Sequence, residues 1–139
     1  MIKKLLYIST LFFLSTNLFA KSEYTKQGID LYNKKKFEDA KFKFEQDIVY
    51  NPKSELSYLY LSKIFNEQDK KNLEEKNLNT VILLNPKNEE AIYNLARLKL
   101  ISSDYEKTKE LNKKLKSICR KFCSKSDQLK TEIENLFKK

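Results

Sequence analysis

The sequence repeats itself with a period of 34 residues. The run Asn51-Pro52-Lys53 recurs as Asn85-Pro86-Lys87, and Tyr24 recurs as Tyr58. A fixed period of this length indicates a stacked-repeat architecture, in which each unit buries its apolar face against its neighbours. Because such folds usually present a surface instead of enclosing a reaction site, the repeat favours a binding role over catalysis.

The composition points to helices and argues against several kinds of active site. The 139 residues include one glycine, two prolines and no histidine. So few turn-forming residues favour helices joined by short polar turns. The lack of histidine removes the commonest general base and metal ligand, and a single glycine excludes the Walker and Rossmann phosphate loops. Adjacent acidic pairs such as Glu74-Glu75 and Glu89-Glu90 diverge on a helix, so we expect no catalytic residues, no metal site and no cofactor.

Apolar residues at helical spacing divide the chain into three helix pairs and one last helix. Pro52 and Pro86 each follow the second helix of a pair, where a helix cannot easily continue. Ser124, with Asp127 three residues later, predicts the start of the last helix. The expected helices cover residues 22–34, 37–50, 54–67, 70–84, 88–101, 104–118 and 125–137.

The first unit resembles a tetratricopeptide repeat, because it carries Tyr24-x-x-Gln27-Gly28-x-x-Leu31, then Ala40-x-x-x-Phe44, then Pro52. Gly28 and Ala40 are small, which lets the two helices of the unit approach closely. The resemblance covers about residues 21–122. It implies an all-α fold, a right-handed α-solenoid of about three helix-turn-helix units (21–54, 55–88 and 89–122) with a capping helix at 123–139.

The second unit departs from this pattern at two positions. Glu74 stands where the small Ala40 has its counterpart, and Lys71 stands where Phe37 has its counterpart. We expect either a looser crossing of the two helices or a turn that is shifted by one residue.

Residues 1–20 have the three-part layout of a secretory signal peptide. Lys3 and Lys4 precede an apolar stretch from Leu5 to Leu14, and the charged sequence begins abruptly after Ala20. The apolar stretch is short against the roughly 20 residues that span a bilayer. We therefore expect cleavage after Ala20, export to the periplasm and no membrane span in the mature chain. The alternative is an uncleaved segment that anchors the protein in the inner membrane.

Charge alone does not indicate a nucleic-acid partner. Removal of residues 1–20 takes Lys3 and Lys4 from the 28 basic residues and leaves the 19 acidic ones, so the net charge falls from +9 to +7. The charges alternate in sign along the chain, as solvated helix faces usually do. In an exported protein we expect a protein or peptide partner and no nucleic acid.

Cys119 and Cys123 form the only cysteine feature. In an oxidising compartment an even number of cysteines indicates a disulfide, and a spacing of four residues allows one with some adjustment. Haem attachment and thioredoxin chemistry both need a Cys-x-x-Cys motif, which is absent, and two thiols without histidine make a poor zinc site. We expect a structural bridge that fixes the turn into the last helix.

Tetratricopeptide proteins line a concave groove with the first helix of each pair, and the resemblance carries that role onto specific residues here. We expect Tyr60 and Tyr93 to serve as aromatic anchors outside the packing between helices, with Lys63 and Arg97 as stacked cations that suit an acidic or polar extended segment. Thr25, Ile29 and Tyr60 hold the positions of the family's carboxylate clamp, so that device is not expected. The implied groove residues are Lys26, Ile29, Tyr32, Tyr60, Lys63, Tyr93, Asn94 and Arg97, with Thr25, Asn33, Leu59 and Asn66 beside them.

Two functions fit these observations. The first is an exported adaptor that binds a protein or peptide in the groove. The second is a structural subunit or assembly factor of a cell-envelope machine, such as a secretion, pilus or motility apparatus, which docks through its convex face or capping helix.

Overall fold

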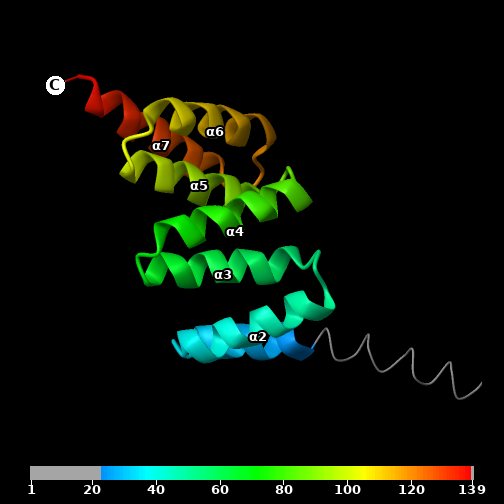
Figure 1. The fold of residues 1–139 in the computed structure, drawn as a ribbon. Helices are drawn as coiled ribbons and strands as arrows, with labels where there is room; N and C mark the ends of the chain where they lie inside the picture. Colours follow the sequence, from blue (N-terminus) through cyan, green and yellow to red (C-terminus); the bar gives the residue numbers. More distant parts are fainter. Residues whose placement is uncertain (1–22, 139) are drawn as a thin grey trace, which may run out of the picture. The chain divides into compact units, whose positions relative to one another are not determined.

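The computed structural model describes residues 23–138, and these contain helices and no strand (Figure 1). Residues 23–33 are helical. They are followed by α2 (Phe37–Tyr50), α3 (Glu55–Glu67), α4 (Lys71–Leu84), α5 (Glu89–Ile101), α6 (Tyr105–Ile118) and α7 (Cys123–Leu136). The all-α repeat fold is therefore confirmed. The signal peptide predicted at 1–20 lies outside the described residues.

The chain divides into two compact units, and the boundary follows Tyr60 within α3. In the first unit, Ala40 and Phe44 of α2 are fully buried. Gly28 faces Phe44, because a Cβ atom at Gly28 would lie only 2.6 Å from Phe44 Cε1. The close helix approach expected at Gly28 is confirmed, and it depends on the missing side chain.

A polar cluster also lies inside the first unit. Asp47, which is 1% exposed, accepts a 2.6 Å hydrogen bond from the Ser57 hydroxyl. Ser54 donates to Ser57 in turn, over 3.1 Å. These hydrogen bonds connect α2 to the start of α3.

The second unit comprises the rest of α3 and helices α4 to α7. Helix α5 packs against α4, α6 and α7, and α6 packs against α7 (Figure 1). Apolar side chains from α5, α6 and α7 supply the interior of this part of the unit. Its buried members include Ile92, Leu95, Ala96, Leu98, Leu111, Leu115, Leu129 and Ile133.

One turn geometry recurs at the end of the first helix in each of the three pairs. Lys35, Asp69 and Ser103 are the non-glycine residues with positive φ among those described, at 58°, 51° and 61°. They lie 34 residues apart. In each turn the next N–H group reaches back to the helix, as in Asp104 to Lys99 O at 2.9 Å. This is the Schellman type of helix end, which usually places glycine at the left-handed position.

Glu74 is buried in the second unit without shifting the turn. Helix α4 begins at Lys71, 34 residues after the start of α2 at Phe37, so the suggested one-residue shift is wrong. Glu74 is 4% exposed, and both of its carboxylate oxygens accept from Asn66 Nδ2 at 3.2 Å. Burial raises the pKa of Glu74 more than the Asn66 hydrogen bond lowers it.

The last helix begins earlier than expected and without the expected cap. Helix α7 starts at Cys123, and Phe122 at its N-cap makes no side-chain capping bond. The predicted start at 125, with Ser124 and Asp127 as a cap, is therefore wrong. The backbone before the helix is held instead by a residue of α5, Glu89.

Candidate functional site

In the first unit, the structure places the predicted groove residues on the helix at 23–33 and on α3. Lys26 is exposed, whereas Ile29, Tyr32 and Tyr60 are half-buried. The Tyr60 ring stacks on Phe44 with centroids 5.1 Å apart, and Tyr32 meets it edge-on at 5.2 Å. Tyr60 therefore contributes to packing between helices, and the expectation that it stands outside this packing is wrong. Leu59, expected beside the groove, is only 6% exposed and belongs to the core.

In the second unit, both predicted cations have acidic partners. Lys63 Nζ lies 2.7 Å from Glu90 Oε1, and Arg97 pairs with Glu132 of α7. These pairs link α3 to α5 and α5 to α7. Because each positive charge has a carboxylate beside it, the two cations present less net charge to a ligand than the sequence suggested.

Tyr93 of α5 belongs to an aromatic cluster that includes residues missed by the sequence analysis. Its ring centroid lies 5.7 Å from that of Phe122. Lys125 Nζ sits 4.9 Å from the Tyr93 ring centroid and 4.7 Å from that of Phe122, both within cation–π range. The 34-residue period could have pointed to Phe122. Asn88 immediately precedes α5, and Phe122, 34 residues later, immediately precedes α7.

Two further residues of α5 lie beside this cluster. Asn94 directly follows Tyr93, and Arg97 lies one helical turn after Tyr93. All three side chains are half-exposed. We call Tyr93, Asn94 and Arg97 the α5 face. Within residues 23–138 the Asn94 side chain has no hydrogen-bond partner, so its amide can both donate to and accept from a peptide backbone.

The cluster is positioned by the loop between α6 and α7. The Glu89 carboxylate accepts backbone hydrogen bonds from Arg120, Lys121 and Phe122 at 2.9, 2.9 and 2.8 Å. Desolvation raises the pKa of Glu89, but the three N–H donors and the Arg120 charge outweigh it, so the pKa lies below its usual value. Ionised Glu89 thus fixes the backbone that carries Phe122 against Tyr93.

Cys119 and Cys123 close the same loop with a disulfide, and their Cα atoms are 5.2 Å apart. The bridge encloses the three residues whose N–H groups bind Glu89. It therefore fixes the turn into α7, as the sequence analysis expected.

The described residues contain no cluster of three or more histidine, cysteine, aspartate or glutamate side chains that can hold a metal ion. Between residues 23 and 138, no helix is both long enough and apolar enough to cross a membrane. The α5 face offers aromatic, amide and paired ionic groups, which suit recognition of a polypeptide.

The helix pairs, their 34-residue register and their turns define a tetratricopeptide-repeat fold. The sequence matches no established family profile and no curated protein. Solved structures confirm the fold. The TPR2B domain of yeast Sti1, in a pHsp70 complex, is 14% identical with a TM-score of 0.78, covering 85% of this chain and 98% of that one.

Two further structures show the same fold. The first RPAP3 (Spaghetti) repeat domain, bound to the HSP90 peptide SRMEEVD, is 12% identical with a TM-score of 0.76, covering 86% of this chain and 94% of that one. The Yersinia enterocolitica secretion chaperone SycD, in complex with a peptide of the translocator YopD, is 15% identical with a TM-score of 0.75. That match covers 85% of this chain and 94% of SycD.

Proposed function

We propose that this protein is an exported, periplasmic adaptor that binds a protein or peptide partner through the α5 face. The RPAP3 and SycD structures named above contain bound peptides, the Sti1 domain is in a pHsp70 complex, and the shared fold supports a similar role here. The observation that carries the proposal is the Tyr93–Phe122–Lys125 cluster beside the Asn94 amide, which has no hydrogen-bond partner in the described range 23–138. A pre-positioned aromatic ring supplies contact area at low entropic cost, and the amide supplies backbone hydrogen bonds.

The ion pairs of Lys63 and Arg97 indicate which ligand suits this face. An acidic segment has to compete with Glu90 and Glu132 for the two cations. A polar, extended segment can bind Asn94 and Tyr93 without breaking either pair. We therefore favour a polar extended segment over a strongly acidic one.

Site-specific photo-crosslinking in the native host tests this function. A benzophenone amino acid at position 94 should give adducts with a partner protein. The matched control is position 83 of α4, because Leu83 is 82% exposed and is not part of the α5 face. Adducts at 83 and none at 94 would contradict the proposal.

The second candidate function, docking within a cell-envelope assembly through α7, is also favoured by one observation, an open pocket between α6 and α7. Crosslinks from α7 together with none from position 94 would favour this function over the first.

A further inference from the structure

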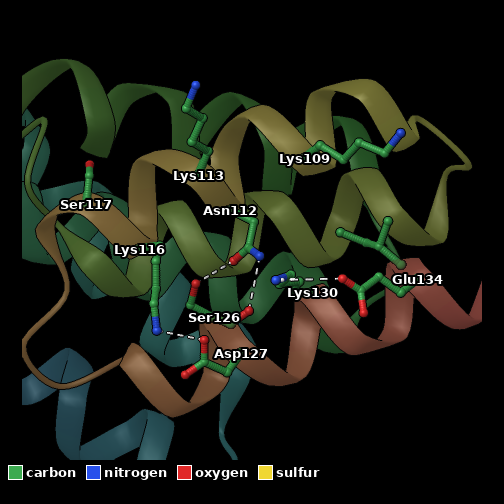
Figure 2. Close-up of a pocket in the computed structure, with 10 residues that line it drawn as sticks. Lys109, Asn112, Lys113, Lys116, Ser117, Ser126, Asp127, Lys130 and Glu134 are labelled. Atoms are coloured by element: carbon green, nitrogen blue, oxygen red, sulfur yellow. Dashed lines mark hydrogen bonds and ion pairs between the residues drawn. The ribbon is translucent and has the colours of Figure 1, made fainter.

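A pocket of about 580 Å³ lies between α6 and α7, on residues that the α5 face does not include. Its base is a closed polar pair. Asn112 Nδ2 donates to the Ser126 carbonyl at 3.0 Å, and the Ser126 hydroxyl donates to Asn112 Oδ1 at 2.8 Å (Figure 2). Both residues are buried. Since these groups already have partners, they hold the two helices together and leave recognition to the residues above them.

The repeat register identifies what the pocket is shaped to receive. Helix α7 starts at Cys123, 34 residues after the start of α5 at Glu89, so it corresponds to the first helix of a further pair. Lys130, which lines the pocket, falls at the position of Gly28. Gly28 is the residue that touches the second helix of its own pair, at Phe44. The pocket is thus the place where a second helix would pack on α7, and no described residue fills it.

Lys130 prevents the close packing that a regular repeat helix makes. The small residues Gly28, Ser62 and Ala96 occupy its equivalent positions. A lysine there holds an incoming helix further away and presents an ammonium group to it. The pocket therefore favours a helix that carries carboxylates over an apolar repeat helix.

The charges around the pocket favour the same occupant. Four lysines line it, against Asp127 and Glu134. Three of these lysines have a carboxylate beside them: Lys116 pairs with Asp127 at 2.7 Å, Lys109 with Glu106 at 2.9 Å, and Lys130 contacts Glu134 at 3.7 Å. Lys113 is exposed and has no acidic partner within the described part of the chain; Figure 2 shows it extending from α6 with no interaction drawn to it.

An apolar strip continues along α7 from the pocket. Ile133 lines the pocket but is only 6% exposed, whereas Phe137, one turn further on, is 60% exposed and meets the Tyr105 ring edge-on at 5.5 Å. Lys109 of α6 lies 4.9 Å from the Phe137 ring centroid, so a cation borders this end of the strip. An apolar strip flanked by lysines complements a helix that has one apolar face with acidic residues beside it.

We propose that the α6/α7 pocket docks an acidic amphipathic helix of a partner protein. Apolar residues of that helix contact Phe137, and its carboxylates pair with Lys113 and with Lys130, where they compete with Glu134. This surface shares no residue with the α5 face.

Binding of designed peptides tests the chemistry of the pocket. The probe is a labelled peptide of roughly 15 residues, long enough for marginal helicity, with leucine on one face and glutamate elsewhere. A second peptide has lysine in place of glutamate. Fluorescence anisotropy with the purified protein should show binding of the acidic peptide only, and Lys113→Glu with Lys130→Glu should weaken it by about tenfold or more, a loss of ~1.4 kcal/mol.

The matched control is Lys76→Glu with Lys87→Glu, which makes the same charge change at two exposed lysines outside the pocket. It should alter the affinity by no more than about twofold, since distant exposed charges are screened. Equal weakening by both double variants, or equal binding of the two peptides, would overturn the proposal. Thermal melts of each variant identify any loss of folding.

Crosslinking from position 113 tests the native occupant. The adduct should contain an acidic amphipathic segment of another protein and should disappear in Lys130→Glu. An adduct with a second copy of this chain would overturn the proposal in favour of self-association. Absence of any adduct would overturn it as well. Neither result bears on crosslinking from position 94, so the two proposals fail independently.

Discussion

The carboxylate of Glu89, at the start of α5, accepts a 2.8 Å hydrogen bond from the backbone N–H of Phe122, immediately before α7. This hydrogen bond joins the start of α5 to the residue before α7, 33 positions further along the chain. The same carboxylate binds the N–H groups of Arg120 and Lys121. The first residue of α5 thus holds the backbone that leads into α7.

Glu89→Gln should lower the melting temperature at neutral pH, because an amide oxygen is a weaker acceptor than a carboxylate for three N–H groups. The pKa of Glu89 is lowered in the folded state, so its contribution is fully present above the ordinary value of 4.5 and is lost as the pH falls through the folded pKa. Melting curves of both proteins from pH 7 to pH 3 should converge at the acidic end. A constant gap between them would show that the ionised carboxylate is not responsible.

Glu74→Gln should have the opposite effect at neutral pH and raise the melting temperature. Burial raises the pKa of Glu74, so folding is penalised while the group is ionised. The penalty is fully present above the folded pKa and disappears as the pH falls towards 4.5, the ordinary value. Glutamine keeps an oxygen that accepts from Asn66. A variant that melts below the wild type at pH 7 would contradict this account.

Ser103→Gly should stabilise the protein by about 0.5–1 kcal/mol, because Ser103 has a φ of 61° that glycine adopts without steric cost. The neighbouring Ser102 has a φ of −84°, so Ser102→Gly should destabilise the protein through backbone entropy alone. Urea unfolding of the two variants measures the difference. The same sign of change for both would show that the left-handed geometry is not the cause.

Tyr60→Ala should destabilise the protein by about 2–4 kcal/mol, since the ring packs on the buried Phe44. Tyr60→Phe retains both ring contacts and should cost much less.

Tyr93→Ala removes a half-exposed ring, so it should lower partner binding by more than about 1 kcal/mol with a smaller effect on folding. Chemical unfolding and binding assays, run on the same three variants, separate the two roles. Unchanged binding in Tyr93→Ala would count against the α5 face.

Mass spectrometry of the protein from its native host should find an N-terminus at Lys21, as cleavage after Ala20 requires. The two-lysine start and the short apolar stretch motivate this prediction. Intact protein that begins near Met1 in the membrane fraction would instead support the anchored alternative.

The fold could be predicted from the sequence because repeat spacing and proline positions both limit helix length. Most observed helix ends agree with the expected ones to within one residue. The left-handed turns were missed because lysine, aspartate and serine stand where glycine would have marked them.

The site was harder to predict than the fold. Helical spacing places Tyr60 on a surface, but it does not show that the ring leans onto Phe44. The carboxylate of Glu89 binds backbone groups, so no residue type at 120–122 reveals the contact. The ion pairs of Lys63 and Arg97 could not be predicted from the sequence, because their partners Glu90 and Glu132 come close only when the helices pack together.

Gly28 and Phe44 have a consequence for mutational tolerance. In the register of the repeat, glycine faces phenylalanine, serine falls opposite Leu78, and alanine opposite Asn112. Where the first residue is larger than glycine, the second is smaller than phenylalanine, so the two side chains of each pair share one space between the helices. Any side chain at position 28 meets the Phe44 ring, and a smaller residue at 44 makes room for it. A scan of all double substitutions should therefore show 28 and 44 tolerating changes jointly that neither tolerates alone.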